Sequence, residues 1–105
     1  MKQVVPASEV TEVLIKEWQD KFGKVTTWKS KSGKQVWFRS PDRKEIAAAQ
    51  KIAETQDGIT SNQVLAKATC VAGDIEILEE QKVIIALGKH LSKIIEVEEG
   101  EFTEL

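Results

Sequence analysis

The chain has 105 residues, one cysteine and a formal net charge of −2 at pH 7. A length in this range forms one domain, and a lone cysteine excludes an intramolecular disulfide. No apolar run approaches the roughly 20 residues of a membrane-spanning helix, and the first residues lack the apolar core of a signal peptide. We therefore expect one cytoplasmic domain over residues 1–105, with frayed ends at residues 1–7 and 98–105.

Charged side chains are unevenly distributed along this nearly neutral chain. Residues 21–51 carry nine basic and two acidic side chains, whereas residues 74–105 carry three basic and nine acidic ones. This asymmetry indicates a basic binding face, an acidic tail that faces a partner, or head-to-tail self-association. We give equal weight to the simpler explanation that the surface is solvated and its charge is uneven without a binding role.

The first predicted element is an amphipathic helix from Ser8 to Phe22. Ser8 can cap its N-terminus, and Gly23 suits the position just after its C-terminus. Apolar side chains recur at helical spacing at Val10, Val13, Leu14, Trp18 and Phe22. The stripe predicts a helix that packs on the core, and docking on a partner is the less favoured alternative.

Residues 24–39 predict a β-hairpin, because strand-forming side chains flank the turn dipeptide Ser32-Gly33. A two-residue turn at this dipeptide places Trp28 opposite Trp37, and both on one face of the hairpin. The other face would carry Val25, Val36 and Phe38. Since both faces are apolar, either the fold covers both or the tryptophan face is a contact surface.

The second strand runs into a helix through Arg39-Ser40-Pro41. Ser40 suits the N-cap position, and Pro41 suits the first helical position, where its missing N–H loses no hydrogen bond. This alanine-rich helix extends to about Glu54. The joint therefore predicts a strand followed directly by a capped helix.

Two further helices complete the prediction. Ser61 caps a short helix that contains Cys70, and a long helix runs from about Glu79 to about Val97. The apolar face of the long helix consists of Val83, Ile84, Leu87, Leu91, Ile94 and Ile95. The predicted fold class is α+β, with an N-terminal helix, a β-hairpin and then three helices packed in one small domain.

The sequence contains no catalytic constellation. His90 and Cys70 are the only histidine and cysteine, which is too few for a structural zinc site. The glycines are isolated rather than grouped in a phosphate-binding loop. We therefore expect a binding protein rather than an enzyme, with no cofactor and no metal site.

Nucleic-acid binding is the alternative function. Lysines surround Trp28, Trp37 and Phe38 in the predicted hairpin, and basic residues interleaved with aromatic ones suit a platform for stacking single-stranded bases. The chain is acidic overall and carries no recognised nucleic-acid motif, so this alternative is less favoured.

Several short motifs, in this order of elements, resemble a known family. The most distinctive are the joint Phe38-Arg39-Ser40-Pro41-Asp42-Arg43 and the segment Cys70-Val71-Ala72-Gly73-Asp74. From about Val13 to Glu104 the chain is similar to the small tail assembly chaperones of long-tailed phages and prophages, particularly those of gut Bacteroidetes.

The resemblance implies a partner and a location. Such chaperones bind the long, helical tape measure protein in the host bacterial cytoplasm before the tail tube polymerises around it. The resemblance therefore leads us to expect a tail assembly chaperone whose partner is a tape measure protein. A homo-oligomer remains open, and neither a membrane nor a nucleic acid is the expected partner. The expected contact residues are Trp28, Trp37, Arg39, Arg43 and Lys44.

Overall fold

The computed structural model describes residues 4–95 and 98–105. In chain order its elements are η1 (Ala7–Glu9), α1 (Glu12–Phe22), β1 (Val25–Lys29), β2 (Gln35–Arg39), α2 (Arg43–Thr55), α3 (Gly58–Thr69), β3 (Cys70–Gly73), η2 (Ile75–Glu79), α4 (Gln81–Gly88) and η3 (Leu91–Ile94). The strands form an antiparallel sheet in the order β1-β2-β3. These helices and this small sheet confirm the predicted α+β class.

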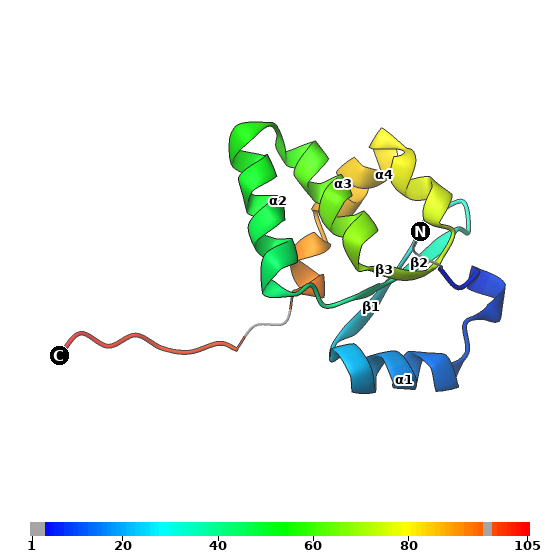
Figure 1. Ribbon diagram of the computed structural model, residues 1–105, viewed down its shortest axis with the longest axis horizontal. Coiled ribbons are helices and arrows are strands. Elements are labelled where there is room, and N and C mark those ends of the chain that lie inside the picture. Colours follow the sequence, from blue (N-terminus) through cyan, green and yellow to red (C-terminus); the bar gives the residue numbers. More distant parts are fainter. Residues whose placement is uncertain (1–3, 96–97) are drawn as a thin grey trace.

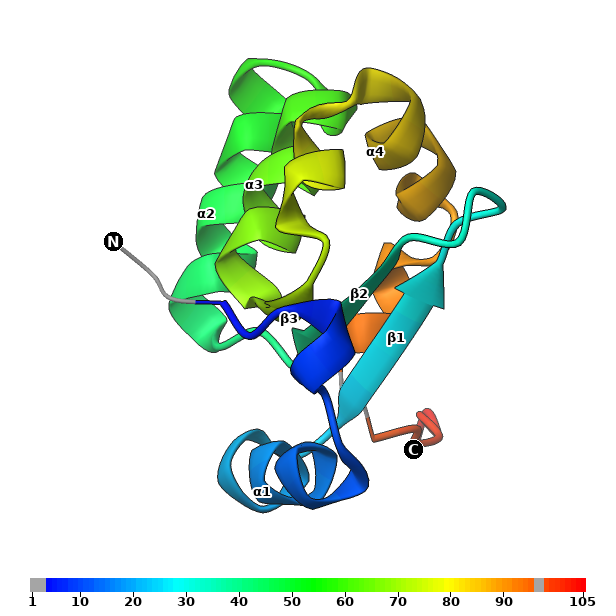
Figure 2. The same ribbon diagram turned by 90° about the vertical axis from the view of Figure 1, so that its right-hand side faces the viewer.

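The sheet lies between two unequal groups of helices (Figures 1 and 2). The elements α3, α4, η2 and η3 lie over one face, and α2 packs along α3. On the other side of the sheet lies α1, which contacts β1 and β2 but contains no buried residue. The main core therefore forms on the side of α3 and α4.

The hairpin register differs from the predicted one by one residue. Trp28 pairs with Val36 rather than with Trp37. The N–H of Gly33 donates to the carbonyl oxygen of Ser30 at 3.0 Å, and Gly33 has a φ of +93°. The chain therefore turns through a longer loop that ends in a glycine with positive φ, not through a two-residue turn at positions 32 and 33.

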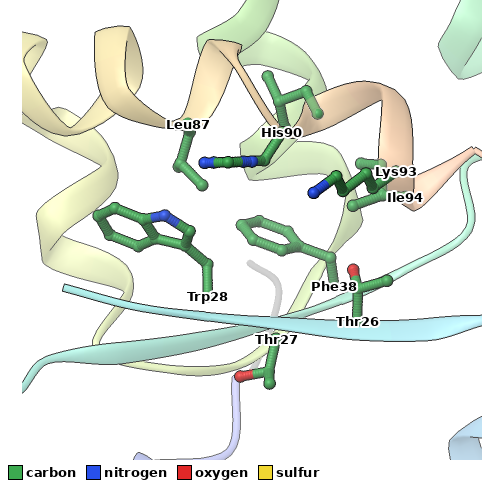
Figure 3. A pocket seen from close by; sticks show the side chains of 9 residues that line it. Thr26, Thr27, Trp28, Phe38, Leu87, His90, Lys93 and Ile94 are labelled. Atoms are coloured by element: carbon green, nitrogen blue, oxygen red, sulfur yellow. The ribbon is translucent and has the colours of Figure 1, made fainter.

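This one-residue shift separates the two tryptophans. Trp28 shares its face with Val36 and Phe38 and points toward α4, as Figure 3 shows for Trp28 and Phe38. Trp37 lies on the opposite face, yet it is only 9% exposed. The predicted face shared by Trp28 and Trp37 is therefore wrong, because side chains alternate along a strand and a slip of one residue exchanges faces.

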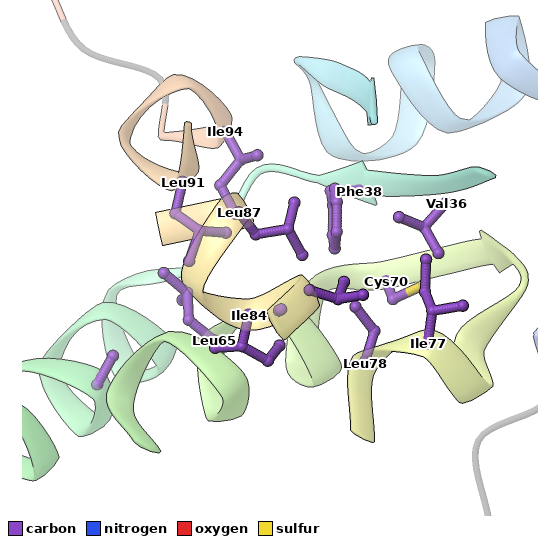
Figure 4. Close-up of a cluster of buried hydrophobic side chains, with 13 residues drawn as sticks. Val36, Phe38, Leu65, Cys70, Ile77, Leu78, Ile84, Leu87, Leu91 and Ile94 are labelled. Atoms are coloured by element: carbon purple, nitrogen blue, oxygen red, sulfur yellow. The ribbon is translucent and has the colours of Figure 1, made fainter. Parts of the chain in front are cut away.

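The main core joins β2 and β3 to the helices on one side of the sheet (Figure 4). Its largest fully buried apolar side chains include Phe38, Leu78, Ile84 and Leu87. The predicted apolar face of the C-terminal helix is confirmed in these positions, since Val83, Ile84, Leu87, Leu91 and Ile94 are all buried. Burial of these side chains away from water is the main force that holds the domain together.

The helix starts differ from the predicted ones. Thr11, not Ser8, caps α1, and its hydroxyl accepts a hydrogen bond from the N–H of Leu14 at 3.2 Å. Asp42, not Ser40, caps α2, and its carboxylate accepts a hydrogen bond from the N–H of Glu45 at 2.8 Å. The Ser40 hydroxyl instead donates to the carbonyl oxygen of Ile94 at 3.1 Å, and the Ser40 N–H donates to the carbonyl oxygen of Lys24, which continues the hairpin. The predicted C-terminal glycine of α1 is confirmed at Gly23, which has a φ of +83°.

The segment Cys70–Gly73 forms the third strand, where the sequence predicted the end of a helix. Asp57 caps α3, and Ser61 lies inside this helix, donating from its hydroxyl to the carbonyl oxygen of Ala49 at 2.6 Å. Cys70 is therefore a buried strand residue rather than a helical one. Such a short strand is stabilised by its pairing with β2, and no local sequence pattern predicts that pairing.

The predicted long C-terminal helix, from about Glu79 to about Val97, is divided into α4 and η3, and the short helix η2 ends at Glu79 just before them. A break follows Gly88, a residue that weakens a helix interior. Glu96 and Val97, where the helix was predicted to end, lie outside the described residues. Residues 98–105 are exposed and form no regular secondary structure. Near the other end, Val5 forms a parallel bridge with Ala72, so this part of the segment expected to fray is paired with the sheet.

Candidate functional site

An apolar hollow of about 410 Å³ lies between β1 and the C-terminal helices (Figure 3). Trp28 and Phe38 rise from the sheet, while Leu87 and Ile94 approach from α4 and η3. The remaining lining residues are Thr26, Thr27, His90, Leu91 and Lys93. A hollow with mostly apolar walls and a few polar groups suits the side chains of a partner.

One polar atom in this hollow has an unused hydrogen-bonding capacity. The Thr26 hydroxyl oxygen is buried and makes no hydrogen bond with any described residue. His90 and Lys93 also line the hollow but are exposed to solvent. Since the Thr26 hydroxyl oxygen has almost no accessible surface, it lies beneath the wall of the hollow, and the exposed polar groups of the hollow include those of His90 and Lys93.

A second hollow of about 640 Å³ lies beside Trp28, toward the hairpin loop. Its apolar floor includes Ile77 and Val83, and its charged lining residues are Lys29, Lys31, Lys34, Lys82 and Glu80. We call the two hollows together the Trp28 groove, because Trp28 lines both of them. The groove is thus apolar at one end and basic at the other.

Two of the groove lysines already have acidic neighbours. The ammonium nitrogen of Lys34 lies 3.2 Å from a carboxylate oxygen of Glu76, and the corresponding distance from Lys82 to Glu80 is 3.5 Å. The hydrogen bond to Glu76 and the charge of that carboxylate raise the pKa of Lys34 above its ordinary value. Lys29 and Lys31 form no ion pair within the described residues, which leaves them the better candidates for contacting an acidic partner.

Arg39, predicted as a contact residue, is engaged inside the domain. Its guanidinium donates to both carboxylate oxygens of Glu45 at 2.7 Å each and to the carbonyl oxygen of Ala68 at 3.0 Å. The ring of Phe22 lies 5.6 Å from the guanidinium carbon, measured to the ring centroid. Arg39 therefore joins α1, β2, α2 and α3, and the hydrogen bonds to Glu45 raise the pKa of Arg39.

The five predicted contact residues do not form one surface. Trp28 lines the groove, whereas Trp37 is buried on the opposite face of the sheet. Arg43 and Lys44 are exposed at the start of α2 and line neither hollow. Of the groove residues in the C-terminal region, Leu87, Leu91 and Ile94 were predicted only as part of a core-facing stripe. The one sequence signal for a groove was that the predicted hairpin carries apolar side chains on both faces.

Comparisons of this chain with protein-family models, with curated proteins and with solved structures found no match. Within residues 4–95 and 98–105, no group of three or more His, Cys, Asp or Glu side chains could hold a metal ion. No helix in the same residues is long and apolar enough to cross a membrane.

Proposed function

We propose that this protein is a tail assembly chaperone that binds an apolar helical stripe of a tape measure protein in the Trp28 groove. The observation that carries the proposal is the apolar hollow around Trp28, which is half-buried beside Leu87 and Leu91. A helix can place apolar side chains from successive turns into such a groove. The resemblance of the chain to tail assembly chaperones supplies the class of partner.

The size of the hollow supports a contact that can be reversed. A hollow of about 410 Å³ takes a few side chains, not a whole helix. Contacts of this extent belong to small, weak interfaces, in which little surface is buried. Weak contacts suit a chaperone, because tail tube subunits must replace it when they polymerise around the tape measure protein.

The geometry gives less support to nucleic-acid binding. Phe38 is 1% exposed and Trp37 is 9% exposed, so neither ring is accessible for stacking on a base. Arg39 is hydrogen-bonded to Glu45. Of the three aromatic side chains that predicted a stacking platform, only Trp28 is not buried, and base stacking along a strand uses several such rings.

Co-expression with the long helical protein encoded downstream tests the proposal. We expect that protein to remain soluble only when this chain is present, and the two to co-elute. Trp28→Ala should reduce the soluble fraction. Trp18→Ala is the matched control, because Trp18 is also half-buried but lies on α1, across the sheet from the groove.

Equal aggregation of the long protein with and without this chain would contradict the proposal. An equal loss of solubility with Trp28→Ala and Trp18→Ala would remove the groove as the binding site. Fluorescence anisotropy with a labelled single strand at low salt then tests the alternative. Binding to such a strand that weakens steeply with added salt would favour a nucleic-acid partner.

A further inference from the structure

The C-terminal segment, residues 98–105, carries large apolar side chains that the domain does not cover. The side chains of Phe102 and Leu105 are both fully exposed to solvent. The other residues include the carboxylates Glu98, Glu99, Glu101 and Glu104. An acidic segment with a fully exposed aromatic ring is a complement for a surface that is apolar and basic.

The Trp28 groove has this complementary character. Its apolar hollow can take a phenyl ring, since the hollow is lined by Trp28 and Leu87. Lys29 and Lys31 lie at its basic end, and no described residue forms an ion pair with either of them. Both features of the segment, the ring and the carboxylates, therefore have a counterpart in the groove.

The segment points away from the groove of its own domain. In Figure 1 it leaves the domain on the side opposite the hairpin loop, whose lysines line the basic end of the groove. Phe102 and Leu105 pack on no part of the described domain, so both side chains are available to contact a second copy. A contact between two different surfaces of identical chains builds rings or open chains, or a two-fold dimer when two copies exchange their segments reciprocally.

We propose that the C-terminal segment of one copy binds the Trp28 groove of a second copy, with Phe102 in the apolar hollow and the carboxylates beside Lys29 and Lys31. The proposal concerns the same groove as the proposed function but requires no phage partner. Either one can therefore fail without the other.

Two variants of the full chain test the contact from its two sides. Phe102→Ser removes the ring from the segment, and it cannot disturb the fold because Phe102 is fully exposed. A chain with both Lys29→Glu and Lys31→Glu reverses the charge at the groove, where both lysines are exposed. Circular dichroism confirms that each variant is folded. Sedimentation velocity measures association over a range of concentrations.

We expect the wild-type mass to rise with concentration and each variant to dissociate about tenfold more readily or more. An equimolar mixture of the two variants should form a one-to-one dimer and no larger species, since one variant keeps its groove and the other keeps its segment. Ile85→Ser should associate like the wild type, because Ile85 is 51% exposed on α4 and lines neither hollow.

A wild-type chain that stays monomeric at all concentrations would overturn the proposal. So would Phe102→Ser chains that associate as strongly as the wild type, or a mixture of the two variants that remains monomeric. Because none of these measurements includes a tape measure protein, their failure is distinct from a failure of the co-expression experiment.

Discussion

Arg39 and Glu45 face each other as two parallel forks. Nη1 of Arg39 donates to Oε1 of Glu45 and Nη2 donates to Oε2, each at 2.7 Å. The same Oε1 accepts a hydrogen bond from the N–H of Asp42 at 2.9 Å, which completes the capping box of α2. One carboxylate therefore connects the end of β2 to the start of α2. This connection explains why Arg39 serves the fold rather than a binding surface.

Arg39→Ala should reduce the free energy of unfolding by about 2–3 kcal/mol, because it removes a bidentate pair that is largely shielded from water. Arg43→Ala is the matched control, since Arg43 is exposed in the first turn of α2 and should change stability by less than about 0.5 kcal/mol. Urea unfolding followed by tryptophan fluorescence measures both values. Equal effects of the two substitutions would contradict a structural role for Arg39.

Trp37→Ala should destabilise the domain by about 3–5 kcal/mol, the usual loss when a large buried ring is removed. The sequence predicted Trp37 as a contact residue, but the ring is only 9% exposed. Trp37→Phe keeps a ring in place and should cost less. Thermal unfolding measures both losses. A Trp37→Ala chain with unchanged stability and weakened partner binding would restore the contact role.

Local patterns in the sequence predicted the buried stripe of the C-terminal region correctly. Ile84 and Leu87 are each 1% exposed, and their spacing alone indicated a core-facing side, because the period of apolar residues is set within one element. The N-cap residues of the helices could not be predicted in this way. Both Ser40 and Asp42 suit the position, but the Ser40 hydroxyl is engaged by the distant carbonyl oxygen of Ile94, and Asp42 accepts the hydrogen bond of the cap.

The hairpin register and the groove could not be derived locally. The loop that ends at Gly33 selects the register, and one residue of slip moved Trp28 to the side of α4. The groove then depends on residues 26–28 meeting residues 87–94. The pattern of apolar residues within each segment does not predict the contact between them. The hollow therefore forms only when the sheet and the C-terminal helices pack together.

Alanine substitutions at three glycines distinguish the stability cost of backbone strain from that of steric clash. Gly33→Ala should cost about 1–2 kcal/mol, because its φ of +93° is strained for alanine although no atom lies within 4 Å of the added Cβ. Gly73→Ala should cost more, because its φ is +109° and the Cβ would lie 2.7 Å from the Cα of Val36. Gly58 has neither problem, so Gly58→Ala should be neutral or stabilising.

Urea unfolding of the three variants should therefore rank them in the order Gly73, Gly33, Gly58, from the most to the least destabilised. The close approach of Gly73 to β2 is what allows β3 to pair there, so the Gly73→Ala chain should also lose strand signal. If Gly73→Ala were as stable as Gly33→Ala, the pairing of β3 with β2 would have to be looser than described.

Asp57 links the stability of α3 to pH. The N–H of Thr60 donates to the Asp57 carboxylate at 2.6 Å and the Thr60 hydroxyl donates at 2.8 Å, and these hydrogen bonds lower the pKa of Asp57 from its ordinary value of 3.8. Because the folded pKa lies below the unfolded one, the stabilisation is complete above pH 3.8 and is lost as the pH falls through the folded pKa.

Asp57→Ala should accordingly lower the melting temperature at neutral pH, and its difference from the wild type should shrink as the pH falls below 3.8. Asp57→Asn is the control, because asparagine can still accept the hydrogen bond from the Thr60 N–H but does not titrate. Calorimetric melting temperatures from about pH 7 to about pH 2 measure the effect. A difference between Asp57→Ala and the wild type that stays constant over this range would show that the carboxylate does not act through its charge.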